Sequence, residues 1–382
     1  MLIFALVRFF VVLLPPQTII TDFCMNFIKT TLLSVLFVGL LPMTTASAQG
    51  EKILREKNPE FFKTDEARRI GDQLIVWQRN TGGWPKNIDM TTPLTDAQRQ
   101  QIIADKKVTD DSTIDNGATT MQMTYLARLW QQTKDERYRE AFNKGVRYLL
   151  SGQYDNGGWP QFWPTMRNYQ VHITYNDDAM VNTLIILREI LKDREPFANL
   201  TDTSLDKDIE RAFQKGVECI LNTQIKVGDT LTVWCQQHDH ETLAPAKARA
   251  YELPSFCSQE SAVIVRFLMN LPNPDERIKQ SIHAAMAWFE KTKITGYRLE
   301  RIGKKNEPGA DTRLVADPNA GPLWARYYDL DNCQPFVCDR DGVPRKHLWE
   351  IGPERRNGYA WYNDRPQQLF EKYDKWKKKW CK

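Results

Sequence analysis

The feature that constrains this chain most is an internal repeat. The motif Gly-Gly-Trp-Pro occurs at 82–85 and again at 157–160. A second pair of segments, Arg139–Val146 and Arg211–Val217, matches once a slip of one residue is allowed, and Asp275–Phe289 is a looser third copy. Glycine and proline interrupt helices, so each motif closes a helical segment. Helical units that recur in this way bury their apolar faces against their neighbours.

Another helix is expected before each copy, and polar residues open all three. The three openings are Asp115-Asn-Gly-Ala-Thr, Asn176-Asp-Asp-Ala-Met and Ser258-Gln-Glu-Ser-Ala. Short polar side chains are favoured there because they accept hydrogen bonds from free backbone N–H groups. We therefore predict an α-dominated fold, an (α/α) repeat toroid or superhelix of about three helix pairs. Long irregular loops and minor β-structure would form an open cleft at one end.

The first 48 residues have the features of an export signal. Lys29 supplies a positive charge, an apolar run covers 31–41, and Ala46-Ser-Ala48 is a small-residue cleavage signal. We expect 25–48 to be a signal peptide and 1–24 to come from an overlong gene start. Residues 49–382 would then form a single domain, exported to the periplasm or released, without a membrane span.

Charge and cysteine content narrow the function. The formal net charge of +4 is mild and gives no reason to expect nucleic-acid binding. Of seven cysteines, six follow the expected cleavage point and could pair in an oxidising compartment, with Cys333 and Cys338 as the best local pair. No cysteine and histidine spacing resembles a zinc site.

The segment 231–260 mixes polar and apolar residues as cleft-lining segments do. It contains Trp234, two histidines and a lone Arg249. Pro245 and Pro254 bracket that arginine, and proline fixes φ and removes a donor. We expect an ordered irregular loop that holds one guanidinium in place.

Acidic residues at the helix openings and arginines in the later loops suggest the chemistry. Asp115, Asp177 and Asp178 could each be a simple helix cap. Together they could hold a hard cation such as Ca²⁺, or act as an acid and base pair in glycoside hydrolysis. Arginine forks recognise carboxylates, so the combination indicates a uronic acid polymer as substrate. The arginines are Arg249, Arg326, Arg340, Arg355 and Arg356.

At these residues the sequence closely resembles the pectate lyases of polysaccharide lyase family ten, over roughly residues 60 to 365. The matching pieces are GGWPKN at Gly82, TIDNGATTMQ at Thr113, GGWPQFWP at Gly157, ITYNDDAMVN at Ile173, WCQQHD at Trp234, LAPAKARAYELPS at Leu243, WARYYDL at Trp324, CDRDGV at Cys338 and ERRNGYAWY at Glu354. Two departures are Cys257-Ser-Gln-Glu-Ser in place of a GSES-like stretch, and Gln334 where a basic residue is expected. The second departure suggests that a peripheral substrate contact is missing.

The resemblance implies a toroid-like catalytic domain that cleaves polygalacturonate by anti β-elimination, with Ca²⁺ bridging enzyme and substrate, in a monomeric protein. It places Arg249 at the Brønsted base and three arginines at substrate contacts. Asp115 and Asp177 fall at acidic cleft positions, where both are candidate metal ligands and Asp115 is also a candidate catalytic residue. Asp178 is a further candidate metal ligand, and Asp178 and Arg356 could exchange roles with their neighbours. The predicted substrate contacts are Arg326, Arg340, Arg355, Lys86, Trp84, Trp234 and His238.

Three alternatives stay open. Arginine normally remains protonated, so Arg249 could instead position a carboxylate while another group such as His238 takes the proton. A glycoside hydrolase would use Asp115 and Asp177 as its carboxylate pair. A carbohydrate-binding protein without chemistry would use the same tryptophans and arginines.

Overall fold

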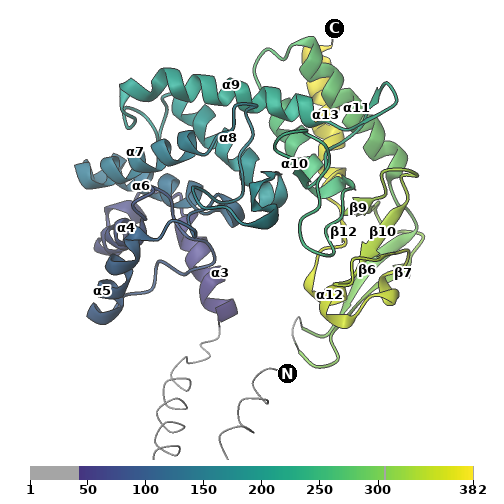
Figure 1. Cartoon of the computed structure of the whole chain (residues 1–382), viewed down its shortest axis with the longest axis horizontal. Coiled ribbons are helices and arrows are strands. Elements are labelled where there is room, and N and C mark those ends of the chain that lie inside the picture. The colour runs from purple at the N-terminus through teal and green to yellow at the C-terminus, as the bar shows by residue number, and fades with distance from the viewer. Residues whose placement is uncertain (1–42, 305–306, 382) are drawn as a thin grey trace, which may run out of the picture. The chain divides into compact units, whose positions relative to one another are not determined.

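The computed structural model describes residues 43–304 and 307–381, and helices dominate it (Figure 1). The chain divides into the units Met1–Ala48 and Gln49–Lys382, and every site discussed below belongs to the second. Most of the predicted signal segment, residues 1–42, lies outside the described residues. In the described part, no helix is both long and apolar enough to cross a membrane.

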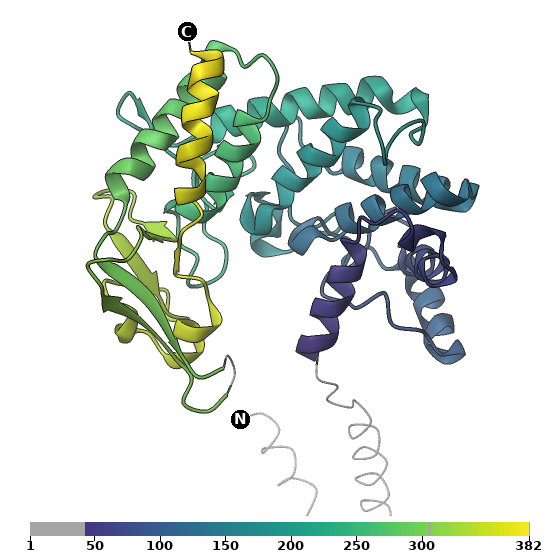
Figure 2. The same cartoon turned by 180° about the vertical axis from the view of Figure 1, so that it is seen from behind.

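Three helix pairs follow one another along the chain, as the repeat predicted. They are α6 (Thr120–Thr133) with α7 (Glu136–Ser151), α8 (Ala179–Leu191) with α9 (Asp206–Thr223), and α10 (Ser258–Met269) with α11 (Glu276–Thr292). The first helices touch in order, α6 to α8 to α10, and the second helices do the same, α7 to α9 to α11 (Figures 1 and 2). The pairs therefore form two layers with a continuous apolar interior.

Further helices flank the pairs. Thr64 caps α4 (Asp65–Trp77) by accepting the Ala67 N–H, as predicted, and α4 packs on α6 and α7. At the other end α13 (Gln367–Trp380) packs back on α10. The remaining helices are α3 (Met43–Leu54), α5 (Asp96–Ala104), α12 (Pro353–Gly358), η1 (Phe61–Lys63), η2 (Asp105–Lys107), η3 (Asp115–Gly117), η4 (Asn168–Val171), η5 (Asn176–Asp178), η6 (Thr203–Leu205) and η7 (Leu348–Glu350).

A buried tryptophan follows the second helix of each pair, and another follows α4. Each indole N–H donates to a backbone carbonyl near the end of the preceding helix, at 2.7 to 2.8 Å, which satisfies the polar end of a large buried ring. The pairs are Trp84 to Leu74, Trp159 to Leu149, Trp234 to Ile220 and Trp324 to Phe289. The repeat therefore has four copies of this anchor, and only the first two carry the Gly-Gly-Trp-Pro motif.

The glycines of that motif let the loop touch a neighbouring helix. Gly157 has φ +91°, and a Cβ added there would lie 2.0 Å from the carbonyl oxygen of Lys215 in α9. Gly82 stands in the same relation to Lys144 of α7, at 2.4 Å. Only glycine fits such an approach, so each loop is fixed against the second helix of the next pair.

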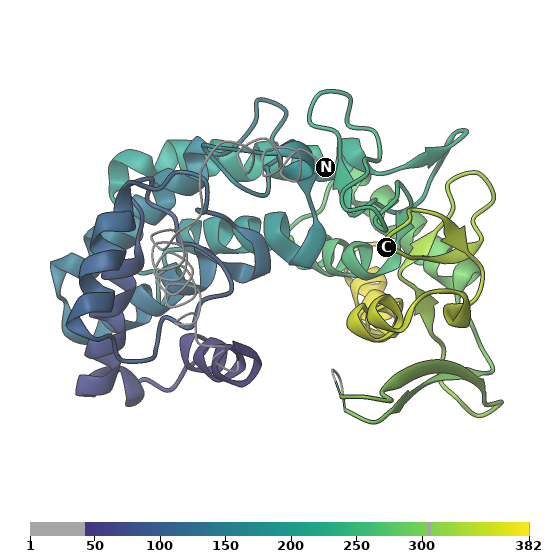
Figure 3. The ribbon, with the colours of Figure 1, turned by 60° about the horizontal axis from the view of Figure 1, so that its bottom comes forward.

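The strands are short and concentrate in the C-terminal part, where the sequence is less helical (Figure 3). One antiparallel sheet has the order β11-β10-β9-β5, and four two-stranded ladders complete the set. The bounds are β1 (Ile173–Thr174), β2 (Lys226–Val227), β3 (Thr230–Leu231), β4 (Gln237–His238), β5 (Phe256–Cys257), β6 (Tyr297–Ile302), β7 (Asp311–Ala316), β8 (Trp324–Ala325), β9 (Tyr327–Tyr328), β10 (Pro335–Cys338), β11 (Pro344–Arg345) and β12 (Tyr362–Asn363).

The six described cysteines are all free, so the pairing that the sequence left open is not formed in this structure. Cys333 precedes β10 and Cys338 ends it. An extended strand rises about 3.3 Å per residue. This separates the two cysteines by more than the roughly 7 Å that a disulfide can span between Cα atoms.

Candidate functional site

Two short turns carry the predicted carboxylates. They are η3 and η5, which contact each other just before the first helices of two successive pairs. Asn116, Asp177 and Asp178 have φ values of 51°, 50° and 62°. Asn and Asp tolerate this left-handed region better than other side chains, which explains why these residue types occupy the turns.

Asp115 is buried and only partly satisfied. Its Oδ2 pairs with Lys86 Nζ and accepts a hydrogen bond from Gln161 Nε2 at 2.7 Å. Its Oδ1 is also buried but has no hydrogen-bond partner among the described residues. One carboxylate oxygen therefore remains available for a cation or a substrate group.

Asp177 reaches the surface beside it. Its Oδ2 accepts from Asn176 Nδ2 at 2.8 Å. Loss of hydration, followed by repulsion from the Asp115 carboxylate, raises the pKa of Asp177 to about 6. The charges of Arg326 and Arg249 oppose this shift. A second positive charge near the two carboxylates would relieve their repulsion.

Asp178 has a separate environment. Its carboxylate pairs with Arg365 at 3.3 Å, and burial raises its pKa despite that arginine. No cluster of three metal-binding side chains in the described ranges contains Asp115, Asp177 and Asp178 together. The three aspartates therefore do not form one compact group here, and the adjacent Asp177 and Asp178 have different partners.

Arginines surround Tyr251 in the loop that the prolines bracket. The guanidinium carbons of Arg355, Arg249 and Arg340 lie 4.5, 5.1 and 6.0 Å from the centre of its ring. These are cation–π distances, and the ring holds like charges close together. The predicted Arg249, Arg340 and Arg355 are thus brought into one cluster.

The fourth predicted arginine lies deeper. Arg326 is 4% exposed and its guanidinium lies 4.5 Å from the centre of the Tyr359 ring. It pairs with the buried Glu260 and donates to Asn176 Oδ1 at 3.1 Å. Arg326 therefore positions its neighbours and has almost no surface of its own for a substrate, unlike the prediction.

Carboxylates pair with the three arginines around Tyr251, of which Arg249 and Arg340 are exposed and Arg355 is buried. The Nε of Arg249 donates to Glu252 Oε2 at 2.7 Å, and although burial disfavours the charge, this pairing raises the pKa of Arg249 above its usual value. Glu354 accepts from Arg355 and Arg340 at 2.7 and 3.1 Å, and these bonds lower its pKa to about 2. In this arrangement Arg249 is fully charged.

A chain of buried hydrogen bonds connects the acidic turns to the arginine cluster. Asn176 Oδ1 accepts from Gln236 Nε2 at 2.7 Å, and the same Nε2 donates to Glu252 Oε1 at 2.9 Å. Glu252 also accepts from the Tyr359 hydroxyl at 2.8 Å. Asp177, through Asn176, and Arg249, through Glu252, are thus held by one network.

Arg356 lies outside the cluster. Its Nε donates to Asp311 of β7 at 2.6 Å, which fixes the end of the β6–β7 hairpin against α12. Arg355, and not Arg356, is the member of the pair that faces Tyr251.

Three predicted substrate contacts are wrong because they are core residues. Trp84 and Trp234 have no exposed surface and serve as the helix anchors described above. His238 is also fully buried: its Nδ1 lies 2.9 Å from the Leu243 carbonyl oxygen and its Nε2 accepts the Cys235 N–H. Burial lowers the pKa of His238 to about 4, and both ring nitrogens are occupied, so it is also excluded as the alternative proton acceptor.

Lys86 is the exception in the first motif loop. It extends from the loop to Asp115, and its Nζ lies 5.3 Å from the centre of the Phe162 ring. Its predicted place at the site is therefore consistent with the structure.

Sequence reasoning missed the neutral and acidic residues that hold the charged ones. Glu252 could have been found, because it follows Arg249 by three residues in a bracketed loop. The others have no sequence signal of their own. The missed residues are Gln161, Asn176, Gln236, Tyr251, Glu252, Glu260 and Tyr359.

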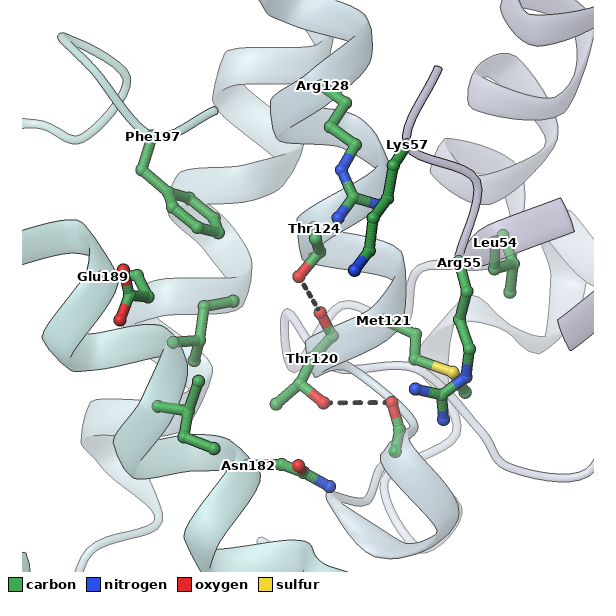
Figure 4. A pocket seen from close by; sticks show the side chains of 13 residues that line it. Leu54, Arg55, Lys57, Thr120, Met121, Thr124, Arg128, Asn182, Glu189 and Phe197 are labelled. Carbon is green, nitrogen blue, oxygen red and sulfur yellow. Dashed lines mark hydrogen bonds between the residues drawn. The ribbon is translucent and has the colours of Figure 1, made fainter. Parts of the chain in front are cut away.

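A separate pocket of about 450 Å³ lies between α6, α8 and the segment after α3 (Figure 4). Its wall includes Thr120, Met121, Arg128 and Phe197. The Thr120 hydroxyl donates to the Gly117 carbonyl at 3.1 Å. None of the predicted site residues lines it, so it is not the site of the predicted chemistry.

Comparisons with known proteins agree with the geometry. The model of the family described as pectic acid lyase matches residues 78–370. A family 10 polysaccharide lyase from Cellvibrio cellulosa is 30% identical, with a TM-score of 0.72, over 88% of this chain and 98% of that one. A mutant of that lyase in complex with trigalacturonic acid gives a TM-score of 0.73 at 30% identity, over 88% and 99% of the two chains. No curated protein sequence matches.

Proposed function

This chain belongs to the pectate lyases of polysaccharide lyase family ten, and from that premise we propose a complete reaction. It cleaves α-1,4-linked polygalacturonate by calcium-assisted anti β-elimination and releases 4,5-unsaturated oligogalacturonides. One observation carries the proposal: the arginines around Tyr251 are joined by a buried hydrogen-bond network to Asp177, which lies beside the buried carboxylate of Asp115 with its unpartnered Oδ1. A polyanionic sugar chain would supply negative charge to the arginines, and a cation would supply positive charge to the carboxylates.

The reaction needs no water. A base removes the proton at C5 of a galacturonate, and its electron pair forms the C4–C5 double bond. The bond from C4 to the glycosidic oxygen breaks, and that oxygen leaves with a proton. Charge develops on the neighbouring carboxylate, so fixed positive groups near it stabilise the transition state more than the ground state.

Arg249 is our candidate for the base. Its side chain is 43% exposed and lies in the loop between Pro245 and Pro254. Two other arginines, Arg340 and Arg355, lie around the same Tyr251 ring. Glu252 keeps Arg249 charged. The base role therefore requires the ion pair with Glu252 to weaken when substrate and cation bind, which lowers the pKa of Arg249. Arg340 and Arg355 bind substrate carboxylates in this proposal. Both already donate hydrogen bonds to one carboxylate, that of Glu354.

The residues present fit a calcium ion shared with the substrate. Asp115 Oδ1 is a buried oxygen without a partner, and the carboxylates of Asp115 and Asp177 repel each other. Calcium binds about six to eight oxygen ligands, so two aspartates leave room for substrate carboxylates and water. When bound, the ion would withdraw charge from the carboxylate beside C5.

The same proposal includes a toroid-like arrangement of the helix pairs and a monomeric, exported protein. The successive contacts of α6 with α8 and of α8 with α10 support the toroid-like arrangement. The apolar run and small-residue signal before Gln49 support export.

The test is the ultraviolet absorbance of a conjugated unsaturated uronide while the chain from Gln49 acts on polygalacturonate. We expect the absorbance to rise with Ca²⁺ and to stop rising with a chelator. New reducing ends without absorbance would instead establish a hydrolase that uses Asp115 and Asp177. Binding without either signal would leave a carbohydrate-binding protein.

Two variants test the role of Arg249. Arg249→Ala and Arg249→Lys should each lower turnover by on the order of 10² to 10⁴-fold, the usual contribution of a proton-transfer group, with an unchanged circular dichroism spectrum. Arg211→Ala is the matched control, because the Arg211 side chain is 66% exposed and, among the described residues, forms its one ion pair with Asp208 on α9. A near-normal rate in the alanine variant would remove Arg249 as the base.

A further inference from the structure

A second group of polar side chains lies at the end of the β1–β4 ladder. Ile173 pairs with His238 in that ladder, so His172 and Asp239 continue it by one residue on each strand. One potential ligand atom from each of His172, Asp239 and His240 lies within 4.8 Å of the other two. His172 Nδ1 and Asp239 Oδ2 are 3.7 Å apart.

The atoms that could bind a ligand are free. The Nδ1 atoms of His172 and His240 are both buried and have no hydrogen-bond partner in the described part of the chain. Asp239 Oδ1 accepts from the N–H groups of Glu241 and Thr242 and from the Thr242 hydroxyl, at 3.1, 2.8 and 2.9 Å. These bonds fix the carboxylate and leave Oδ2 free toward the histidines.

The surroundings hold the group in place. Asn156 Nδ2 donates to the His240 carbonyl at 2.6 Å, and the Tyr154 ring lies 5.3 Å from the His240 ring. Outer contacts of this kind orient the ligands of metal sites. The three side chains are 20%, 32% and 31% exposed, so the group lies near the surface.

We propose that His172, Asp239 and His240 bind a divalent transition-metal ion of the zinc class, at a site distinct from the proposed calcium site. Two imidazole nitrogens and one carboxylate oxygen are a zinc donor set, whereas calcium takes oxygens alone. With bonds of about 2.0 to 2.1 Å, tetrahedral ligand atoms lie about 3.4 Å apart, so small side-chain rotations close the group around an ion. Water occupies the fourth position.

Bound metal would join two segments that are far apart in the sequence, and a third segment holds one of them through Asn156. Asn156 belongs to the second Gly-Gly-Trp-Pro loop, His172 precedes β1, and Asp239 and His240 follow β4. The site stands on these contacts alone and does not depend on the lyase activity.

The chain from Gln49 would be freed of metal with a chelator and titrated calorimetrically with ZnCl₂, and separately with CoCl₂ as a spectroscopic probe. We expect one ion per chain and the visible absorption bands of four-coordinate Co²⁺. His172→Ala, His240→Ala and Asp239→Asn should each weaken zinc binding by at least about tenfold. Asp239→Asn keeps an Oδ1 acceptor for the loop hydrogen bonds, so it tests the site even if the alanine variants misfold.

Two control variants separate this site from others. His347→Ala removes a histidine that stacks on Trp349, and His283→Ala removes the one whose Nε2 lies 3.4 Å from Cys381 Sγ. Both should bind zinc like the unaltered chain. The proposal is overturned if the unaltered chain binds no zinc, if folded Asp239→Asn binds it undiminished, or if His283→Ala abolishes binding.

Discussion

At the scale of single residues, the proposed chemistry depends on the charge of Arg249. The residue lies beside Tyr251, and its charge acts on Asp177. Its partner Glu252, however, stabilises the protonated form. Glu252 therefore controls the pH at which a neutral guanidine becomes available.

Removing the charge of Glu252 should change the pH dependence of catalysis. Glu252→Gln keeps the shape of the side chain and lowers the pKa of Arg249 relative to the unaltered chain. A base acts in its deprotonated form, so the rising limb of kcat/KM should move to lower pH. The measurement is a pH series of initial rates at limiting substrate.

Glu354→Gln is the matched control, because Glu354 pairs with Arg340 and Arg355 but not with Arg249. It should leave the rising limb of kcat/KM at the same pH, although KM itself should change. An unchanged limb in Glu252→Gln would mean that another group takes the proton.

Asp177 gives a second prediction, on stability without metal. Its pKa in the folded state, about 6, exceeds the usual value of 3.8, so the folded chain binds more protons between these values and loses stability as pH rises through them. Asp177→Asn should therefore be more stable than the unaltered chain above pH 6, measured with chelator present. The difference should vanish near pH 3, where both side chains are neutral, and a difference that does not depend on pH would contradict the assignment.

At the scale of elements, the helix pairs are joined by loops that approach neighbouring helices closely. The four tryptophan anchors fix each loop to the helix before it. The glycines fix the first two loops to a helix of the next pair. The carboxylate-bearing turns η3 and η5 contact each other and α8, and η5 also contacts α10.

Gly157→Ala should destabilise the fold more than a positive φ alone explains. The φ strain of a non-glycine residue costs about 1 to 3 kcal/mol, and the new methyl group would also overlap the Lys215 carbonyl. Gly228→Ala is the control, because Gly228 has φ +58° with no atom within 4 Å of an added Cβ. Urea unfolding would compare the two, and equal losses would show that the loop can move away from α9.

At the scale of the whole molecule, the site joins segments far apart in the sequence. Asn176 of η5, Glu260 of α10 and Arg326 after β8 meet in one buried group. Their contacts bind the second and third helix pairs to the C-terminal sheet. Stability and site geometry should therefore respond together when one member is removed.

Glu260→Ala leaves the buried charge of Arg326 without its partner. Breaking a buried pair in this way costs about 3 to 5 kcal/mol, so unfolding should occur at clearly lower urea concentration and lyase activity should fall. Glu218→Ala removes the exposed partner of Arg277 and should cost at most about 1 kcal/mol. The assigned coupling is wrong if both variants unfold at the same urea concentration.

The sequence alone determined the helix pairs, their polar openings, and the residue types of the acidic and basic halves of the site. Helical periodicity, caps and glycine turns are short-range properties, so a local reading finds them. Of the residues that this reading named, Lys86 pairs with Asp115, and Arg249, Arg340 and Arg355 lie around Tyr251.

Only the tertiary structure decided which of those residues are accessible and what they pair with. Trp84, Trp234 and His238 have the right chemistry for a sugar site, but they are buried, and burial depends on packing between elements. Asp178 and Arg326 likewise have partners that are distant in sequence. The histidine and aspartate group arises in the same way: His172 is far in sequence from Asp239 and His240, and strand pairing brings it to them, so no spacing rule could reveal it.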